Sequence, residues 1–449
     1  MRTIVVVGGG AAGATAASRA KRLCPSCRVV LVEAGDVITH APCALPYAIG
    51  GMAEESIWLF EKEEFELERG VEVFLRTKAV DVENGRVKLV GEHGGAVDYD
   101  ALIIATGARP WTPPVEGLDL RGVVVPTVAN LRLAKAVLSA ARRVAVIGAG
   151  YIGVEMADVL AAMGKHVTLI EGGGWPLPRV LDGDMGRLLA SHMAARGVAL
   201  RFGERVQRLE GSGGRVEHVV TDAGRYEVDA VVFATGVKPN VDLALRAGAK
   251  LGPTGAVAVN KYMEAGPPGV YVAGDAAEAV HKVTGEPVWT PLATYANKMG
   301  YVAGTNAALD KRAVEFPPIA GASVTKFGDL YVGAVGLTEA EAARRGLSPT
   351  SYVIKSTDKA RYMKETREIV IKAVIGGGGR LLGMQIMGHS AIVGAYVDLA
   401  AQFVGEPAER LFHAEYSYMP FTAPPWHPFA VVGRLWLRNY HRPNGPSAP

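Results

Sequence analysis

Short apolar runs without a polar position, each followed by a glycine-rich turn, occur twice along the chain. The first run covers residues 4–7 and leads into Gly8, and the second covers residues 144–147 and leads into Gly148. Runs of this length predict strands that are buried on both faces of a parallel sheet. An alanine-rich segment of helical character follows each turn, so each copy predicts a strand–turn–helix unit.

Both copies carry the glycine spacing of a dinucleotide-binding turn. The glycines are Gly8, Gly10 and Gly13 in the first copy and Gly148, Gly150 and Gly153 in the second. A second apolar run then ends in an acid, Glu33 or Glu171, roughly 20 to 25 residues beyond the first glycine. Successive glycines permit a tight turn, admit a pyrophosphate and let helix and strand pack, while the acid accepts a ribose hydroxyl. One fingerprint is weak evidence, but two complete ones predict two bound dinucleotides.

The two units also resemble each other at their last strands. The turns are Thr106-Gly107 after residues 102–105 and Thr235-Gly236 after residues 231–234. A further predicted strand at 269–273 ends in Gly274 and Asp275, and we expect it to return to the first sheet. An aspartate at such a strand end can hydrogen-bond a ribitol hydroxyl, and two dinucleotides in one chain favour a flavin and a nicotinamide that exchange hydride.

The last 130 or so residues carry a different pattern and no nucleotide fingerprint. Residues 368–375 and 380–387 are apolar and β-branched, with a glycine turn at 376–379, and predict a hairpin. Residues 391–404 predict a helix. The predicted fold class is therefore α/β, with two Rossmann-like nucleotide-binding domains followed by an α+β domain.

Composition and charge narrow the class of protein. The chain has 449 residues, 49% of them hydrophobic, and a net charge of +3, which is too mild to imply nucleic acid but suits anionic nucleotides. We expect no membrane span, because no apolar stretch reaches about 20 residues. The apolar strand begins close to Met1 without a signal peptide, so we expect a cytoplasmic protein. The scarcity of glutamine leans weakly towards a thermophile.

The three cysteines point to redox chemistry at one of them. Cys43 follows the first nucleotide unit, and no later residue is a cysteine, so its thiol must work as a mixed disulfide or a sulfenic acid. Cys24 and Cys27 form a C-x-x-C whose functional readings are a second redox pair or half of a metal site. No further ligand pair completes four ligands, so we predict no metal and favour a surface disulfide or two ordinary thiols.

Taken together, these motifs resemble the pyridine nucleotide-disulfide oxidoreductase family over nearly the whole chain. The resemblance implies an FAD-binding domain at 1–111 and 253–318, an NAD(P)H-binding domain at 112–252 and an interface domain at 319–449. It also implies a homodimer. The residues that match the family's cofactor positions are Gly8, Gly10, Ala11, Ala12, Gly13, Glu33, Ala34, Thr106, Gly107, Gly148, Gly150, Tyr151, Ile152, Gly153, Glu155, Glu171, Gly236, Gly274 and Asp275.

The segment around Cys43 resembles the single-cysteine subgroup of that family. The two-cysteine reductases carry a second cysteine five residues later, where this chain has Ala48. The subgroup contains coenzyme A disulfide reductases, water-forming NADH oxidases and NAD(P)H sulfur or polysulfide reductases, and residues 45–47 look most like the first of these. The first glycine turn lacks the histidine that NADH peroxidases carry there, so the chain resembles that pattern less.

The resemblance also implies substrate and proton-donating residues. The substrate residues for coenzyme A are Arg19, Arg22, Thr39 and Asn297, and the catalytic residues beside Cys43 are Tyr362 and Tyr418, which would reach the partner subunit's site. Ordinary surface or interface roles are the alternative for each. Tyr151 matches an aromatic residue that covers the flavin until nicotinamide displaces it. Pro42 and His427 depart from the branch's pattern.

We therefore predict a coenzyme A disulfide reductase that passes electrons from NADH to FAD and on to a Cys43 mixed disulfide. An NADH oxidase with a Cys43 sulfenic acid and an NAD(P)H polysulfide or sulfur reductase are the alternatives. A flavin redox sensor with little turnover is less favoured. Glu171 should repel the 2′-phosphate of NADPH, and no arginine directly follows it, so we expect a preference for NADH with NADPH possible.

Overall fold

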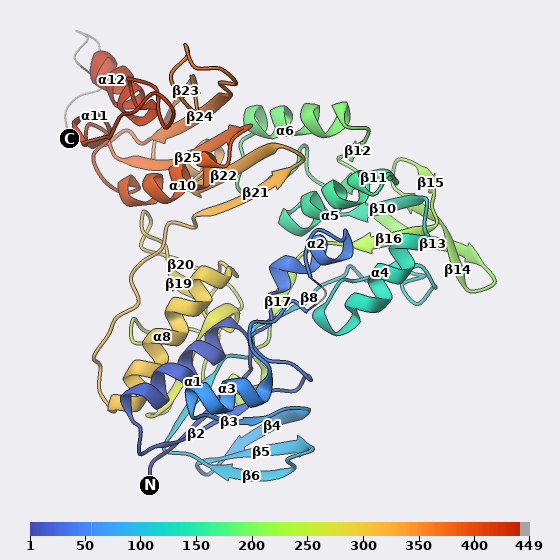
Figure 1. The fold of residues 1–449 in the computed structure, drawn as a ribbon, viewed down its shortest axis with the longest axis vertical. Coiled ribbons are helices and arrows are strands. Elements are labelled where there is room, and N and C mark those ends of the chain that lie inside the picture. The colour runs from blue at the N-terminus through green and yellow to red at the C-terminus, as the bar shows by residue number, and fades with distance from the viewer. Residues whose placement is uncertain (55, 441–449) are drawn as a thin grey trace.

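The structure is a computed structural model that describes residues 1–54 and 56–440. It has three parts, each built on its own sheet (Figure 1). The first glycine unit lies at the bottom of the view, the second at the right and the C-terminal region at the top.

The first part is a parallel sheet in the order β18-β7-β1-β2-β3. Its strands are β1 (Thr3–Val7), β2 (Arg28–Val32), β3 (Glu72–Phe74), β7 (Ala101–Ile104) and β18 (Val270–Val272). The late strand β18 pairs with β7, which confirms the predicted return of the chain to this sheet. Helices α1 (Ala11–Leu23), α3 (Lys62–Arg69) and α8 (Ala293–Leu309) belong to this part, as does an antiparallel sheet of β4 (Thr77–Glu83), β5 (Arg86–Gly91) and β6 (Gly95–Asp98).

Glycines let α1 and α8 lie against each other at backbone distance (Figure 1). A Cβ at Gly300 would stand 2.1 Å from the carbonyl oxygen of Ala12, and one at Gly304 would stand 2.4 Å from that of Ala16. No side chain fits into such a gap. The close approach holds the loop before α8 next to the first glycine turn.

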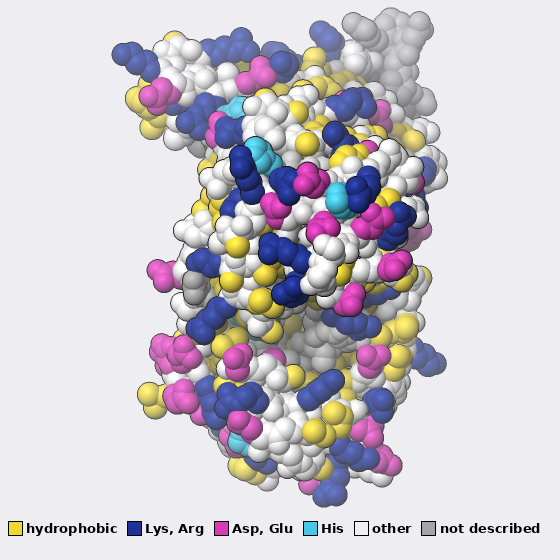
Figure 2. Space-filling view, turned by 90° about the vertical axis from the view of Figure 1, so that its right-hand side faces the viewer, with side chains coloured by type: hydrophobic (Ala, Val, Ile, Leu, Met, Phe, Trp, Pro, Cys, Tyr) yellow, Lys and Arg dark blue, Asp and Glu magenta, His cyan; other side chains and the backbone are white. Residues whose placement is uncertain are grey.

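The second part repeats the arrangement with the parallel order β12-β11-β10-β16-β9. The strands are β9 (Val123–Val124), β10 (Arg143–Ile147), β11 (His166–Glu171), β12 (Ala199–Phe202) and β16 (Ala230–Phe233). Its helices are α4 (Leu131–Ala140), α5 (Tyr151–Ala162) and α6 (Gly183–Ala195), and a small antiparallel sheet holds β13 (Val206–Ser212), β14 (Arg215–Thr221) and β15 (Arg225–Glu227). On the face drawn in Figure 2, basic and acidic side chains are interspersed.

The C-terminal part is an antiparallel sheet in the order β21-β22-β25-β24-β23. Its strands are β21 (Ser323–Phe327), β22 (Leu330–Gly336), β23 (Thr350–Thr357), β24 (Glu368–Ile375) and β25 (Leu381–Gly388). The predicted hairpin is β24–β25, and the predicted helix is α10 (Ile392–Phe403), which packs on the sheet. The remaining helices are α9 (Glu339–Arg344), α11 (Arg410–His413) and α12 (Pro428–Tyr440).

Short segments connect these parts. The ribbon of β8 (Ala108–Pro110) and β17 (Val237–Pro239) joins the two nucleotide units, and α7 (Asp242–Arg246) follows it. A second ribbon holds β19 (Ala279–Val280) and β20 (Pro287–Val288). The 3₁₀ turns are η1 (Pro42–Ala44), η2 (Val128–Asn130) and η3 (Gly274–Ala276), and α2 (Leu45–Ile49) continues η1. The α/β fold class is thus confirmed, while the domain boundaries stay a prediction.

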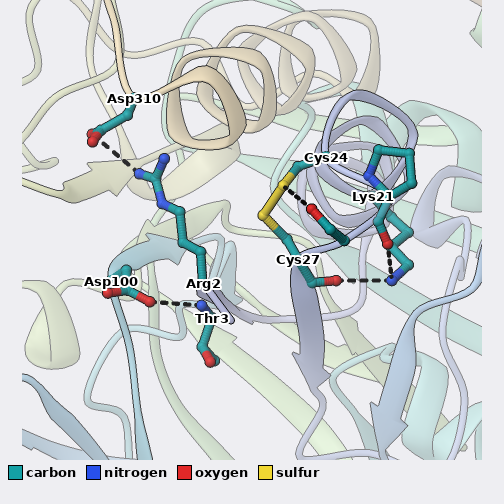
Figure 3. The surroundings of a disulfide bond; sticks show 9 residues. Arg2, Thr3, Lys21, Cys24, Cys27, Asp100 and Asp310 are labelled. Atoms are coloured by element: carbon teal, nitrogen blue, oxygen red, sulfur yellow. Dashed lines mark hydrogen bonds and ion pairs between the residues drawn. A yellow bond between two sulfur atoms is a disulfide. The ribbon is translucent and has the colours of Figure 1, made fainter.

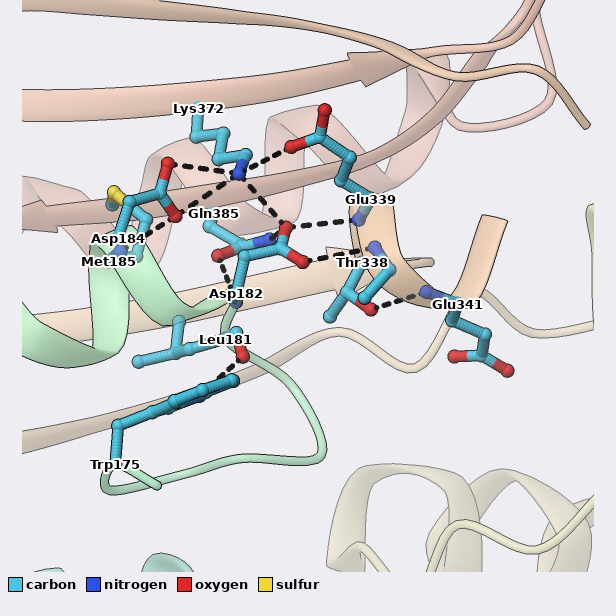
Figure 4. A network of polar contacts seen from close by, with 11 residues as sticks. Trp175, Leu181, Asp182, Asp184, Met185, Thr338, Glu339, Glu341, Lys372 and Gln385 are labelled. Carbon is cyan, nitrogen blue, oxygen red and sulfur yellow. Dashed lines mark hydrogen bonds and ion pairs between the residues drawn. The ribbon is translucent and has the colours of Figure 1, made fainter. Parts of the chain in front are cut away.

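A buried polar cluster joins the second part to the C-terminal part (Figure 4). Lys372 of β24 is only 4% exposed, and its Nζ lies 3.3 Å from Asp182, 2.9 Å from Asp184 and 2.8 Å from Glu339. Gln385 donates to Asp182 at 2.6 Å and accepts from the Asp182 backbone N–H at 2.9 Å. Because each buried charge has several partners, the cluster fixes how α6 meets the third sheet.

No helix among residues 1–54 and 56–440 is long and apolar enough to cross a membrane.

Candidate active site

The first glycine turn has the geometry that a pyrophosphate needs. Gly8 has a φ of +106°, and a Cβ there would stand 2.2 Å from the carbonyl oxygen of Ala105. A Cβ at Gly13 would stand 1.7 Å from the carbonyl oxygen of Gly8, so strand and helix touch at this point. Gly10 caps α1 without a side-chain hydrogen bond, which leaves the first N–H groups of the helix available to an anion.

The second glycine turn repeats this geometry in the other unit. Gly148 has a φ of +96°, and a Cβ at Gly153 would stand 1.9 Å from the carbonyl oxygen of Gly148. Gly150 caps α5 without a side-chain hydrogen bond, and a Cβ at this residue would meet nothing within 4 Å. The space above the N-terminus of α5 is therefore free for a phosphate to approach, as a bound dinucleotide requires.

Each acid after the second strand holds its own turn. Glu33 accepts from the N–H groups of Gly9 at 2.6 Å and Gly35 at 2.7 Å. Glu171 accepts from those of Ala149 and Gly173, both at 2.7 Å. A carboxylate has about four acceptor positions, so each acid keeps capacity for a ribose hydroxyl.

Asp275 lies beside the first turn as a half-buried carboxylate without a donor among the described residues. A Cβ at Gly274 would stand 2.8 Å from Cβ of Ala12, which places η3 against the start of α1. Burial raises the pKa of Asp275 to about 6, and no residue among those the structure describes donates a hydrogen bond to this carboxylate. A hydroxyl donor such as the ribitol of FAD would satisfy it, so the residues present fit that cofactor.

The two Thr-Gly turns are bonded across the connection between the nucleotide units. The hydroxyl of Thr106 donates to the carbonyl of Asn240 at 2.7 Å, and Asn240 donates back to the carbonyl of Thr106 at 2.9 Å. The N–H of Trp111 donates to the carbonyl of Gly236 at 2.9 Å. Both predicted turns therefore lie where the two units meet.

Cys43 is a free and exposed thiol in the 3₁₀ turn that begins α2. Its loop is tied to the first glycine turn, because the N–H of Thr39 donates to the carbonyl of Gly9 at 2.7 Å. The apolar residues after it, Leu45, Ala48 and Ile49, pack into the core of the second unit with α4 and α5. Figure 1 shows α2 among the elements of that unit. The thiol therefore lies where the first and second units meet.

A partly buried carboxyl group links the Cys43 segment to the second nucleotide unit. Glu155 of α5 accepts from the hydroxyl of Thr325 at 2.8 Å and from the Tyr47 hydroxyl, and burial raises its pKa. Burial raises the pKa of Tyr47 as well. Lys326 of β21 brings a charge to this region and binds Asp158 at 2.7 Å, a contact that sequence reasoning missed.

Tyr151, the predicted covering residue, begins α5. Its hydroxyl is hydrogen-bonded to the hydroxyl of Ser323, and burial raises its pKa to about 12. The hydrogen bond reaches from the second unit to the third sheet. The role of Tyr151 over a flavin stays a prediction.

The predicted substrate residues lie in two places. Arg19 donates to the hydroxyl of Thr305 at 3.0 Å, and Arg22 is exposed near the C-terminal end of α1. Asn297 accepts from Thr15 at 3.2 Å. Thr39 lies in the Cys43 loop, where its hydroxyl accepts from the N–H groups of residues 59 and 60 at 3.1 and 2.9 Å. Their roles towards coenzyme A stay predictions.

The two predicted catalytic tyrosines contact each other on the C-terminal part. The hydroxyls of Tyr362 and Tyr418 are 2.5 Å apart, and this hydrogen bond raises the pKa of Tyr418. Their loops are joined where the N–H of Ala360 donates to the carbonyl of Pro420 at 3.0 Å. Tyr362 is 70% exposed and Tyr418 is 47% exposed, so both are open to a partner.

Sequence reasoning also missed a histidine at the first turn. The ring of His40 lies 3.7 Å from the position that a Cβ of Gly10 would occupy. The glycine turn itself has no histidine, but the fold brings one over it from the Cys43 loop. The backbone bond from Thr39 to Gly9 causes this placement, and spacing along the chain carries no sign of it.

The C-x-x-C forms a disulfide between Cys24 and Cys27 at the C-terminal end of α1 (Figure 3). Lys21 holds this turn by donating to the carbonyls of Pro25 at 3.0 Å and Cys27 at 2.8 Å. The pair lies at the opposite end of α1 from the glycine turn and the Cys43 loop. No group of three or more potential metal ligands occurs in the described part of the chain.

The fold and site together define a class of protein. Two dinucleotide units, a free thiol at their junction and an antiparallel C-terminal part are the features of an NAD(P)H-dependent flavoprotein that exchanges electrons with sulfur. The chain belongs to the pyridine nucleotide-disulphide oxidoreductase family, whose model matches residues 2–300. The model of that family's dimerisation domain matches residues 322–422.

Two characterised relatives match along nearly their whole length. The chain is 39% identical to an NAD(P)H coenzyme A polysulfide/persulfide reductase of Pyrococcus horikoshii, over 97% of this chain and 98% of that protein. It is 34% identical to an NADH oxidase of Methanocaldococcus jannaschii, over 97% and 98%.

Two solved structures have the same fold. The NAD-dependent persulfide reductase of A. fulgidus superposes with a TM-score of 0.93 at 32% identity, covering 97% of this chain and 83% of that one. The reduced CoADR-RHD of Bacillus anthracis has a TM-score of 0.92 at 28% identity, covering 97% and 80%.

Proposed function

We propose that this protein reduces sulfur–sulfur bonds of coenzyme A compounds with electrons from NAD(P)H, with Cys43 as the covalent relay. The observation that carries the proposal is the position of Cys43, an exposed free thiol at the junction of two dinucleotide units. The names of the Pyrococcus and A. fulgidus relatives support a persulfide or polysulfide acceptor.

The first unit would hold FAD, and the second would hold NAD(P)H. Gly8, Gly10 and Gly13 would admit the FAD pyrophosphate, Glu33 would accept from its ribose, and Asp275 would accept from its ribitol. When bound, FAD supplies two-electron transfer between nicotinamide and sulfur. Thr106, Gly107 and Gly236 line the joint between the two units.

A single thiol is sufficient to reduce the sulfur–sulfur bond of the acceptor. The Cys43 thiolate attacks one sulfur of the acceptor, so that one S–S bond breaks, a mixed disulfide forms and a first thiolate leaves. Two electrons then cleave the mixed disulfide and regenerate the Cys43 thiolate. Each departing thiolate takes one proton, and a phenol can donate it.

We further propose a homodimer in which Tyr362 of the partner subunit and Tyr418 of the partner subunit supply those protons. The support is that both hydroxyls are exposed together on the part that matches the dimerisation domain. Exposed Phe421 and Trp426 lie in the same segment, and an exposed apolar patch favours a protein–protein interface.

Arg19 and Arg22 would meet phosphates of coenzyme A. The location that we propose is the cytoplasm.

A Cys43→Ser variant tests the proposal directly. We expect NADH-dependent reduction of coenzyme A disulfide or polysulfide to fall at least about a thousandfold, because removal of a nucleophile abolishes the covalent route. Reduction of a dye by NADH should stay near the wild-type rate, which shows that the cofactor sites are intact. A wild-type rate on the sulfur acceptors would contradict the proposal. Mass spectrometry of the purified protein should find a coenzyme A adduct on Cys43.

NADH oxidase is the second candidate, because the Methanocaldococcus relative carries that name. In this case Cys43 would cycle through a sulfenic acid with oxygen as the acceptor. NADH consumption with oxygen alone, compared with consumption under argon plus a coenzyme A disulfide, separates the two functions.

A further inference from the structure

An arginine that is far from Glu171 in the sequence lies beside it in the fold. The chain leaves β12 at residue 202, and the next residues run alongside the Glu171 turn. The N–H of Gly203 donates to the carbonyl of Gly173 at 2.9 Å, and the N–H of Glu204 donates to the carbonyl of Glu171 at 3.2 Å. These two bonds fix the place of Arg205.

The side chain of Arg205 lies over the turn and is not engaged elsewhere. Its Cγ and Nε lie 3.6 and 3.7 Å from the position that a Cβ of Gly172 would occupy. Its backbone N–H donates to Asp222 at 2.9 Å, but its exposed guanidinium forms no ion pair with any described residue. The neighbouring Glu204 is occupied by the hydroxyls of Thr221 at 2.8 Å and of Tyr226 at 2.9 Å.

The first unit provides an internal comparison. There the N–H of Arg76 donates to the carbonyl of Gly35 at 2.8 Å and that of Thr77 to the carbonyl of Glu33 at 3.0 Å, so the same two bonds join the strand to the acid turn. The guanidinium of Arg76, however, is paired with Glu92, with Nη2 and Oε2 3.0 Å apart. By these bonds Arg76 corresponds to Gly203 and Thr77 to Glu204, so Arg205 takes the position of Lys78 in the first unit. The arginine at the edge of the first unit is neutralised, whereas Arg205 forms no ion pair with any described residue.

We infer that Arg205 binds the 2′-phosphate of NADPH and determines how well the protein accepts that cofactor. Glu171 binds the ribose hydroxyl of NADH and repels a phosphate at the same atom. A guanidinium over the turn that directly follows that carboxylate offsets the repulsion and forms charge-assisted hydrogen bonds to phosphate. The protein therefore uses both nucleotides, although no arginine directly follows Glu171. The inference rests on the proposed nicotinamide site and not on the electron acceptor.

Binding of two nucleotides that lack the nicotinamide tests the role of Arg205 without turnover. Calorimetry on the flavin-loaded protein compares ADP-ribose with 2′-phospho-ADP-ribose. In Arg205→Ala we expect the Kd of the phosphorylated nucleotide to rise about tenfold, while the Kd of ADP-ribose stays within about twofold. The kcat/KM for NADPH should fall by the same factor relative to that for NADH. Arg205→Lys should retain part of the affinity.

Arg208→Ala is the matched control, because Arg208 is an exposed arginine three residues further on, in β13, and is already paired with Glu210 at 2.6 Å. It should change neither Kd. Equal weakening of both nucleotides in Arg205→Ala would assign the residue to the adenine instead, and no change in either would also overturn the inference. The calorimetry contains no electron acceptor, so its outcomes do not depend on which compound Cys43 reduces.

Discussion

At the scale of single residues, several groups in the site lack a hydrogen-bonding or reacting partner within the described part of the protein. Asp275 is half-buried and accepts no hydrogen bond from a described residue, the N-termini of α1 and α5 have uncapped N–H groups, and the thiol of Cys43 is exposed. Polar groups shielded from water normally have a hydrogen-bond partner, so the Asp275 carboxylate and the two helix N-termini mark places for ligand atoms. Local features of this kind can be recognised in part from the sequence, because glycine spacing and strand-ending acids are sequence patterns.

Asp275→Asn should raise the stability of the flavin-free protein and weaken the retention of FAD. The folded-state pKa of about 6 lies above the ordinary value of 3.8, so ionisation of Asp275 destabilises the fold as pH rises from about 4 to above 6. The asparagine removes this penalty, which is at most about 3 kcal/mol. Thermal melts of the flavin-free protein should therefore show a gain at pH 7.5 and almost none at pH 4.

The Asp275→Asn substitution should also weaken the binding of FAD. Asparagine is a poorer acceptor for a hydroxyl than a carboxylate, so FAD should dissociate more readily from the variant during dialysis. Asp36→Asn, at an exposed aspartate after Glu33, serves as the control for a lost charge. A variant that loses both stability and flavin would show that Asp275 is a structural residue.

At the scale of elements, the short helix α2 has a larger role than its length suggests. Its five residues begin directly after Cys43 and η1, and its apolar side chains lie in the core of the second unit although the chain is still in the first. A Cβ at Gly50 would stand 2.8 Å from Cβ of Val159, so the packing is close. The thiol is thereby held against the second nucleotide unit. Nothing in the periodicity of so short a segment predicts this partner.

The disulfide at the end of α1 should stabilise the fold without taking part in turnover. Closing a loop of four residues is worth about 2 kcal/mol in the chain-entropy account. Cys24→Ser should therefore lower the melting temperature, and a reductant should lower that of the wild type but not that of the variant. Ser26→Ala, a neighbouring change that keeps the disulfide, should melt like the wild type.

The Cys24→Ser variant also decides whether the C-x-x-C is a structural disulfide or a second redox pair. The pair lies at the far end of α1, about 19 Å of helix from the glycine turn for 13 residues. Turnover with sulfur acceptors should thus stay at the wild-type rate in Cys24→Ser. A large loss of turnover in a folded variant would instead identify Cys24 and Cys27 as a second redox pair.

At the scale of the whole molecule, the proposed site is incomplete in one chain. Cys43 lies between the first and second parts, whereas the hydroxyls of Tyr362 and Tyr418 are exposed on the C-terminal part. The buried Lys372 cluster fixes that part against α6, so the tyrosines have a defined position relative to their own nucleotide units (Figure 4). A second copy of the chain is the simplest way to bring tyrosine to thiol.

Mixed dimers test whether the tyrosines act across the interface. One subunit carries Cys43→Ser, and the other carries Tyr362→Phe with Tyr418→Phe. Each homodimer should be slow, by about a hundredfold for the phenylalanine variant. The mixed dimer contains one complete site if the tyrosines serve the other subunit, so co-expressed protein should recover up to half of the wild-type rate. Purification with two different tags isolates the mixed species.

If each tyrosine pair instead served its own chain, no complete site would form and the mixed dimer would stay as slow as its parents. Tyr301→Phe, added to the subunit that carries Cys43→Ser, is a control for the loss of a tyrosine hydroxyl. Tyr301 is an exposed tyrosine outside the Tyr362–Tyr418 pair. Light scattering of the wild type should give the mass of a dimer.

The sequence by itself determined the two nucleotide units, the antiparallel C-terminal hairpin and the isolation of Cys43. These depend on local patterns, because apolar runs, glycine spacing and the count of cysteines are readable in order along the chain. The tertiary structure decided what surrounds them. His40 over the first turn, Tyr47 on Glu155, Lys326 beside Asp158 and Arg205 beside Glu171 come from other elements. Long-range packing and backbone hydrogen bonds bring these residues together, and no spacing in the sequence records such contacts.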